Sequence, residues 1–341
     1  MIFRQNNCAI ILPRNYSVCL VLACPVYAVK NSNDMNPDFR IEFQPQLIEE
    51  AAARVMADHA EASLFWQARE QLYENTDGEA REAAFRNFYE SWFNHLGLIA
   101  PLRQVFALWP ILTTATSRCL LIRARAKKQL GAELYITAEE PGMNARERRT
   151  IVVQLTPELL AQPQLFLEFL RHEFLHLVDM LNPHFGYEPN FPKSDAGPAY
   201  DHFLQGRYGV LWDVTIDGRL CQRGWLPPTA REKHFVNFKR AFQGTDEKLA
   251  QTFAQFFDQN SHTHHELVEF ARHPEKWLAG ETVEISSKGR CAICHFPTFQ
   301  LIDPSELAAD LIAKIQEHYP DWNTTQLICQ QCSDLYAARI L

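Results

Sequence analysis

The stretch that decides the fold reads QLFLEFLRHEFLHLVDML and runs from Gln164 to Leu181. Its side chains are apolar nearly all round a helix of 3.6 residues per turn, so we expect a long buried helix that stops at Asn182-Pro183. The polar exceptions gather on one side of that helix: Glu168, His172, Glu173, His176 and Asp179. Burying this stripe without a partner would be costly, and a metal ion is a partner that would satisfy it.

The HExxH spacing inside this stretch indicates a specific chemistry. Residues four apart stack on one helix face, so His172 and His176 can present imidazole nitrogens to one metal ion. Glu173 lies about 100° further round, where it can accept a proton from a metal-activated water without being a ligand. Zinc lowers the pKa of water towards about 7 and polarises a carbonyl, so the pattern predicts hydrolysis at neutral pH.

A third metal ligand is expected from the next helix, roughly Tyr200 to Leu220, which contains Trp212-Asp213-Val214-Thr215-Ile216-Asp217. Here the chain resembles the zincin metallopeptidases, especially the gluzincins. In these an HExxH helix precedes a helix with an acidic ligand and, four residues later, an aspartate that hydrogen-bonds a ligand histidine. The resemblance implies that Asp213 binds the metal and that Asp217 orients His172 or His176. The family usually has Glu at the ligand position, so the shorter Asp213 requires a closer approach of the two helices.

Other residues remain alternatives for the third ligand. His184, Glu188 and His202 all follow the HExxH motif, and His184 comes just after the Asn182-Pro183 break. We rank Asp213 first, followed by His202 and His184. Asp179, one turn beyond His176, is a further carboxylate expected to support the ligands from behind. A peptidase also needs a donor for the developing oxyanion, and the candidates are Tyr187, Tyr200, His202, Tyr208 and Arg219.

Short strands are predicted ahead of the long helix, at Cys119–Ala124, Glu133–Thr137 and Arg149–Leu155. The last of these, RTIVVQL, is a β-branched run followed by Thr156-Pro157, which suits a helix N-cap with proline at the first helical position. In zincins a sheet lies over the active helix and its edge strand pairs with extended substrate. The resemblance therefore implies that Arg149–Leu155 belongs to such a sheet.

The C-terminal segment carries a second metal-binding pattern. The chain has nine cysteines, and four of them form Cys291-x-x-Cys294 and Cys329-x-x-Cys332. Each pair can give two thiolates to a tetrahedral zinc, and the spacer between the pairs contains a predicted helix, Ser305–His318. We interpret this segment as a four-cysteine zinc ribbon whose zinc is structural.

The charge balance bears on the partners of this ribbon. The whole chain has a net charge of −8, and the residues from Glu281 onward hold four Lys and Arg against eight Asp and Glu. Nucleic acid is therefore an unfavourable partner, because phosphate contacts need a basic face. A protein partner or a purely stabilising role fits the ribbon better. No apolar run approaches 18 residues, so no membrane span is expected.

These patterns predict an α+β, predominantly helical protein with a zincin-like core, a small sheet over the HExxH helix, flanking helices and a small zinc ribbon. The expected organisation is a leader at 1–36, a helical region at 37–114, the zincin-like core at 115–228, a second helical region at 229–283 and the four-cysteine module at 284–341. In the second helical region Thr263 and Glu266 form a capping box, so the histidines around it are expected to be solvated at a helix start.

The leader, residues 1–36, is interpreted as unstructured or as a misassigned start ahead of Met35. Ser17–Ala28 resembles a short signal segment, which keeps export or a lipoprotein as the minority alternative. The paired cysteines favour a reducing compartment, so a cytoplasmic location is expected.

The leading function hypothesis is a zinc-dependent metallopeptidase with two zinc ions, one catalytic and one structural. Peptides or proteins are its substrates, and Glu173 is its general base. An HExxH motif with a zinc ribbon also resembles SprT-like proteases, which act on protein attached to DNA, although the acidic charge speaks against this alternative. The third hypothesis is a non-catalytic interaction protein stabilised by zinc.

Overall fold

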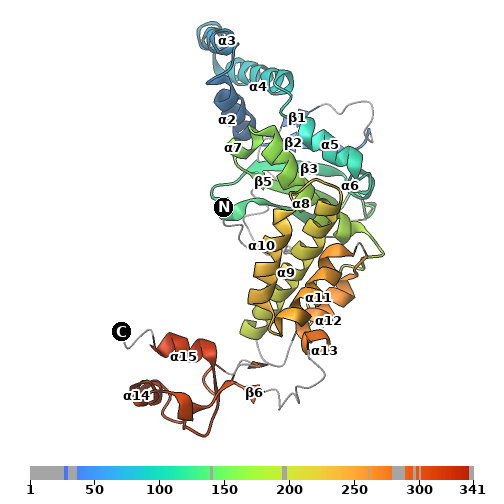
Figure 1. Cartoon of the computed structure of the whole chain (residues 1–341). Helices are drawn as coiled ribbons and strands as arrows, with labels where there is room; N and C mark the ends of the chain where they lie inside the picture. Colours follow the sequence, from blue (N-terminus) through green and yellow to red (C-terminus); the bar gives the residue numbers. More distant parts are fainter. Residues whose placement is uncertain are drawn as a thin grey trace.

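A computed structural model describes residues 27–29, 37–138, 141–193, 198–259, 261–278, 289–294, 297–298 and 301–337 of the 341-residue chain (Figure 1). The described part is mainly helical, with one five-stranded mixed sheet and two small two-stranded sheets. This agrees with the α+β, predominantly helical expectation. Residues 1–26 and 30–36 of the predicted leader lie outside the described residues.

The main sheet runs, in spatial order, through β1 (Tyr27–Val29), β2 (Arg40–Phe43), β3 (Arg118–Arg123), β5 (Arg149–Leu155) and β4 (Gly131–Ile136). β2, β3 and β5 are parallel, whereas β1 and β4 pair antiparallel at the two ends. β5 is the strand predicted from the β-branched run, and most of its side chains are buried, as expected for an interior parallel strand. The edge of the sheet next to the HExxH helix is β4.

The first two strands differ from the expected organisation. β2 lies in the region predicted to be helical, and β1 lies in the predicted leader, so residues 27–29 are not unstructured. Ile41 and Phe43 of β2 are buried, and Phe43 packs edge-on against Phe93 at 5.1 Å between ring centroids. A four-residue strand directly ahead of a proline-initiated helix is too short to show a period of two in the sequence.

The helices between β2 and the HExxH helix cover the sheet and form a projecting hairpin. They are α2 (Pro45–Met56), α3 (Ala62–Asn75), α4 (Gly78–His95), α5 (Ala100–Leu108), α6 (Ile111–Ala115) and α7 (Pro157–Leu160). α3 and α4 contact one another at one end of the molecule (Figure 1). α4 has a stripe of five aromatic side chains, of which Tyr89 and Phe93 are buried, whereas Phe85, Phe88 and Trp92 are partly buried and pack against the core. The Thr156 side chain accepts a hydrogen bond from Leu159 N, which confirms the predicted N-cap.

The centre of the molecule is the crossing of α8 (Pro163–Leu181) and α9 (Pro198–Gln222), visible in Figure 1. α8 contacts α5, α6, α7 and β4, so its apolar sides are covered, and α9 lies along its polar stripe. On its far side α9 contacts α10 (Thr229–Ala241), α11 (Asp246–Asp258) and α12 (His264–Arg272), and the short α13 (Glu275–Leu278) contacts α11.

One large cluster of buried apolar side chains extends from Phe39 to Leu278 and draws on all three predicted regions between 37 and 283. The four-cysteine module has a separate small core around Trp322, Ile315 and Ile328. Its elements are β6 (Gly289–Arg290), β7 (Pro297–Thr298), β8 (Leu301–Ile302), a 3-10 turn (Pro304–Glu306), α14 (Ala309–His318), β9 (Ile328–Cys329) and α15 (Gln330–Ala337). The module thus has its own core, although that core is small.

Among the described helices none is both long enough and apolar enough to cross a membrane.

The close packing of α9 against α11 predicts a measurable effect at Gly218. A Cβ built there would overlap the backbone carbonyl of Phe257, which cannot move aside as a flexible side chain could. We expect Gly218→Ala to lower the free energy of unfolding by about 1–3 kcal/mol, measured by urea denaturation. Gly209 on the same helix has open space at its Cβ position. Gly209→Ala should therefore be neutral or stabilising by about 0.5–1 kcal/mol, and equal effects of the two substitutions would refute the argument.

Candidate metal centre

The polar stripe of α8 meets α9 at three side chains that converge on one point. The ligand atoms of His172, His176 and Asp213 all lie within 4.8 Å of one another. Asp213 Oδ1 is 3.3 Å from His176 Nε2 and 3.9 Å from His172 Nε2. His176 is 4 % exposed, whereas His172 and Asp213 are 29 % and 30 % exposed, so the cluster is open to solvent from one side.

This arrangement fits the dimensions of a tetrahedral zinc site. Zinc–nitrogen and zinc–oxygen bonds are about 2.0–2.2 Å long, which places ligand atoms about 3.3 Å apart. The separation between Asp213 and His176 equals this value, and that between Asp213 and His172 is about 0.6 Å longer. Two imidazoles with one carboxylate form a donor set that zinc accepts. The rivals His184, Glu188 and His202 are exposed, and no metal-ligand group among the described residues includes them. Of the four candidates for the third ligand, Asp213 is the one that lies with the two histidines among the described residues.

Behind the cluster, Asp217 joins two helices. His172 Nδ1 donates to Asp217 Oδ1 at 2.7 Å, and His234 Nε2 of α10 donates to Asp217 Oδ2 at 2.6 Å. The carboxylate thus fixes the ring of His172 with Nε2 turned towards Asp213, as the resemblance implied for one of the two histidines. His234 was not expected from the sequence. It has no spacing relation to the HExxH motif, and only the packing of α10 on α9 brings it here.

The electrostatics of the cluster favour a positive charge at its centre. Burial alone would lower the pKa of His172, but the neighbouring carboxylates, first Asp217 and then Asp213, raise it to about 10. Burial would conversely raise the pKa of Asp217, but its two histidine partners hold it far below the usual range. The carboxylates therefore stabilise a cation between the two helices, either as protonated imidazole or as a bound metal ion.

Asp179 supports the cluster indirectly. This carboxylate is buried and accepts hydrogen bonds from Trp212 Nε1 at 2.8 Å and from both terminal nitrogens of Arg219. The indole of Trp212 lies edge-on to His176, with 4.6 Å between ring centroids. His176 Nδ1 is itself buried and has no hydrogen-bond partner among the described residues, so packing against Trp212 holds this ring.

Glu173 is buried on the side of α8 that faces the sheet. Its Oε2 accepts a hydrogen bond from the backbone N–H of Ala132 on β4, at 2.9 Å. The carboxylate next to the histidine cluster is therefore tied to the edge strand of the sheet.

Two of the candidate oxyanion donors are engaged elsewhere. Arg219 pairs with Asp179, and the buried Tyr208 hydroxyl is hydrogen-bonded to His264 Nδ1 at 2.8 Å.

The capping box of Thr263 and Glu266 is confirmed. The expectation that His264 is solvated at this helix start is wrong, because the side chain turns inward against Tyr208 and is 6 % exposed.

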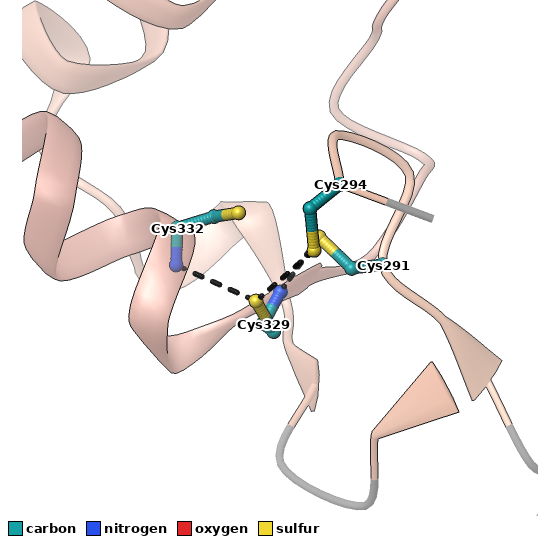
Figure 2. Close-up of side chains that lie close together, drawn as sticks. All are labelled: Cys291, Cys294, Cys329 and Cys332. Atoms are coloured by element: carbon teal, nitrogen blue, oxygen red, sulfur yellow. Dashed lines mark hydrogen bonds between the residues drawn. The ribbon is translucent and has the colours of Figure 1, made fainter. Parts of the chain in front are cut away.

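The four predicted cysteines of the C-terminal module form a second cluster. All four sulfurs lie within 4.8 Å of one another, and Figure 2 shows the side chains of Cys291 and Cys294 on one loop facing those of Cys329 and Cys332. The sulfurs of Cys294 and Cys329 are 3.8 Å apart, close to the spacing of about 3.8 Å expected for two thiolates on one zinc. The cluster could hold a zinc ion.

Backbone groups prepare this cluster for negative charge. Cys329 N donates to Cys291 Sγ at 3.2 Å, and Cys332 N donates to Cys329 Sγ at 3.4 Å (Figure 2). Burial raises the pKa of the Cys291 thiol, but the N–H groups aimed at its sulfur lower that pKa overall. The same burial, together with its thiol neighbours, raises the pKa of Cys332. Four thiolates so close together would require a cation, which a bound metal ion would supply.

Comparison with models of known families, with curated proteins and with solved structures finds no match for this chain.

The cysteine cluster predicts a metal-dependent module. We expect Cys294→Ser to remove one zinc ion per chain, measured by elemental analysis, and to expose α14 and α15 to limited proteolysis. Cys221→Ser is the matched control, because Cys221 is half-buried outside the module. Unchanged zinc content in Cys294→Ser would contradict the assignment.

The bond between His234 and Asp217 predicts that a residue of α10 tunes metal affinity on α8. We expect His234→Leu to weaken zinc binding at His172, His176 and Asp213 by about tenfold, since outer-shell hydrogen bonds typically contribute this much. Competition with a chelator measures this affinity apart from the cysteine site. His184→Leu, at an exposed position, should leave it unchanged. Equal affinities of the two variants would exclude a role for His234.

Proposed function

We propose that the chain is a zinc-dependent metallopeptidase whose catalytic metal is held by His172, His176 and Asp213. The observation that carries the proposal is the convergence of these three ligand atoms beside a buried glutamate in HExxH register. Zinc bound there would supply a water of lowered pKa and a polarised carbonyl.

Each surrounding residue has a role in this proposal. Glu173 is the general base that takes a proton from the attacking water, and its bond to Ala132 N keeps its carboxylate in place. Asp217 keeps His172 in the tautomer whose Nε2 can bind the metal. Asp179 and Trp212 restrain His176 from the other side.

The edge strand β4 suits an extended substrate. In the resembled family an edge strand of the sheet pairs with substrate, and here β4 has β5 as its neighbour on one side, while Glu173 contacts its Ala132 N–H. A peptide laid along this edge would bring its backbone close to the Glu173 carboxylate. We therefore assign peptides or unfolded protein segments as the substrate class, with β4 in the role that the family gives to its edge strand.

Two alternatives are separated by simple experiments. A SprT-like protease acting on DNA-associated protein would bind DNA in a salt-dependent manner, which the net charge of −8 disfavours. A non-catalytic, zinc-stabilised interaction protein would bind two zinc ions and cleave no denatured protein. The cysteine module, with its own core, is the candidate for contacts with a protein partner in either case.

The proposal predicts that Glu173→Gln separates metal binding from hydrolysis. We expect cleavage of a denatured protein substrate to fall by about 10²–10⁴-fold, because the proton acceptor is lost, while both zinc ions are retained. Glu247→Gln, an exposed change on α11, should leave cleavage unchanged. Retained cleavage in Glu173→Gln would remove this residue as the base, and absence of cleavage in the unaltered, zinc-loaded chain would overturn the proposed function.

A further inference from the structure

A hollow of about 480 Å³ is lined by Leu108, Trp109, Arg223 and Trp225. Leu108 and Trp109 come from the end of α5, and Arg223 and Trp225 come from the turn after α9. The two indole rings meet edge-on, with 6.2 Å between their centroids. We call this feature the arginine–tryptophan hollow.

Positive charge is concentrated around this hollow. The guanidinium carbon of Arg223 is 5.1 Å from the ring centroid of Trp225, and that of Arg171 is 4.4 Å from the same centroid. Arg219 is close enough to lower the pKa of Arg223, after the larger effect of burial. In a chain of net charge −8, three neighbouring arginines are an unusual local excess of positive charge.

These positive charges are incompletely compensated within the described residues. The carboxylate of Asp179 forms an ion pair with Arg219. Neither Arg171 nor Arg223 forms an ion pair or a hydrogen bond with the residues that the structure describes, and the Nε of Arg171 is buried without a partner. Glu168 raises the pKa of Arg171, but burial lowers it more. Guanidinium groups that are crowded by like charge, one of them with a buried Nε that has no partner, gain stability when an anion arrives.

The walls of the hollow add an apolar requirement. Trp109 is buried, Trp225 is half-buried, and Leu108 is 38 % exposed, so a ligand here would meet two aromatic rings and an aliphatic side chain. A phosphate or chloride ion would satisfy the charge but leave these walls in water. A carboxylate attached to an aromatic or aliphatic body would satisfy both.

We propose that the arginine–tryptophan hollow binds a small carboxylate with an aromatic or aliphatic body, such as a free organic acid or the C-terminus of a peptide. Arg223 donates the charge-assisted hydrogen bonds, Trp109 and Trp225 pack against the body of the ligand, and Arg171 adds positive charge and holds Trp225 in place. The hollow is distinct from the metal centre, because none of the residues that line it belongs to the group of His172, His176 and Asp213. The inference therefore holds whether or not the chain is a peptidase.

The test is calorimetric titration of the full, zinc-loaded chain with phenylacetate and with the neutral analogue phenylacetamide. For a ligand of this size we expect a Kd of about 1 mM for phenylacetate and binding at least about tenfold weaker for the amide. Arg223→Gln should weaken phenylacetate binding at least about tenfold. Arg240→Gln, an exposed change on α10, should leave it unchanged. Arg223 is itself exposed, so its replacement is compatible with folding, which thermal unfolding checks.

Several outcomes would overturn the proposal. Equal binding of the acid and the amide would show that the charge is not recognised. Inorganic phosphate binding as tightly as phenylacetate would show that the tryptophan walls contribute nothing. Phenylacetate binding that survives Arg223→Gln would place the acid elsewhere, for example on the zinc at His172 and His176. N-acetylphenylalanine serves as the peptide-terminus probe, and its binding relative to phenylacetate tells which source of carboxylate the hollow prefers.

Discussion

The hydrogen bonds accepted by Asp217 are the interaction on which the rest of this structure depends. One carboxylate on α9 holds a histidine of α8 and a histidine of α10 at the same time. It fixes the rotation of α8 and α9 about their own axes, since only one register of the two helices places Asp213 against the HExxH pair. Burial of this carboxylate is tolerated because both of its oxygens have charge-stabilising donors. Without it, His172 would be a half-buried imidazole with no defined tautomer.

Much of the centre could be predicted from the sequence because its signals are local. The period of α8, the four-residue spacing of the histidines and the CxxC pairs each lie within one segment, where geometry follows directly from spacing. The boundaries of α8 and β5 and the N-cap at Thr156 likewise follow from nearby residues. The ranking of Asp213 above His202 and His184 needed a resemblance as well, and among the described residues the structure groups only Asp213 of the three with the histidines.

The features of the fold and of the site that the sequence did not predict depend on contacts between distant segments. His234 reaches Asp217 only because α10 packs on α9, and the inward turn of His264 depends on Tyr208, 56 residues earlier. β2 is too short to be predicted from the sequence pattern, and its place beside β3 is set by the buried side chains of Ile41 and Phe43. The two sides of α8 also differ in charge, with carboxylates around His172 and arginines around Trp225. Residues that are neighbours in the sequence of α8 thus lie in environments of opposite charge.

The placement of β2 beside β3 has a consequence for how the chain acquires its structure. β2 must pair with a strand that begins only at Arg118, after the whole of α2 to α6 has been made, and β3 must in turn wait for β5. Parallel pairing across such long connections is entropically slow to nucleate. The sheet that supports α8 is therefore expected to form late during folding. The helix α8 itself forms rapidly, so its apolar faces are expected to stay uncovered until the sheet has formed.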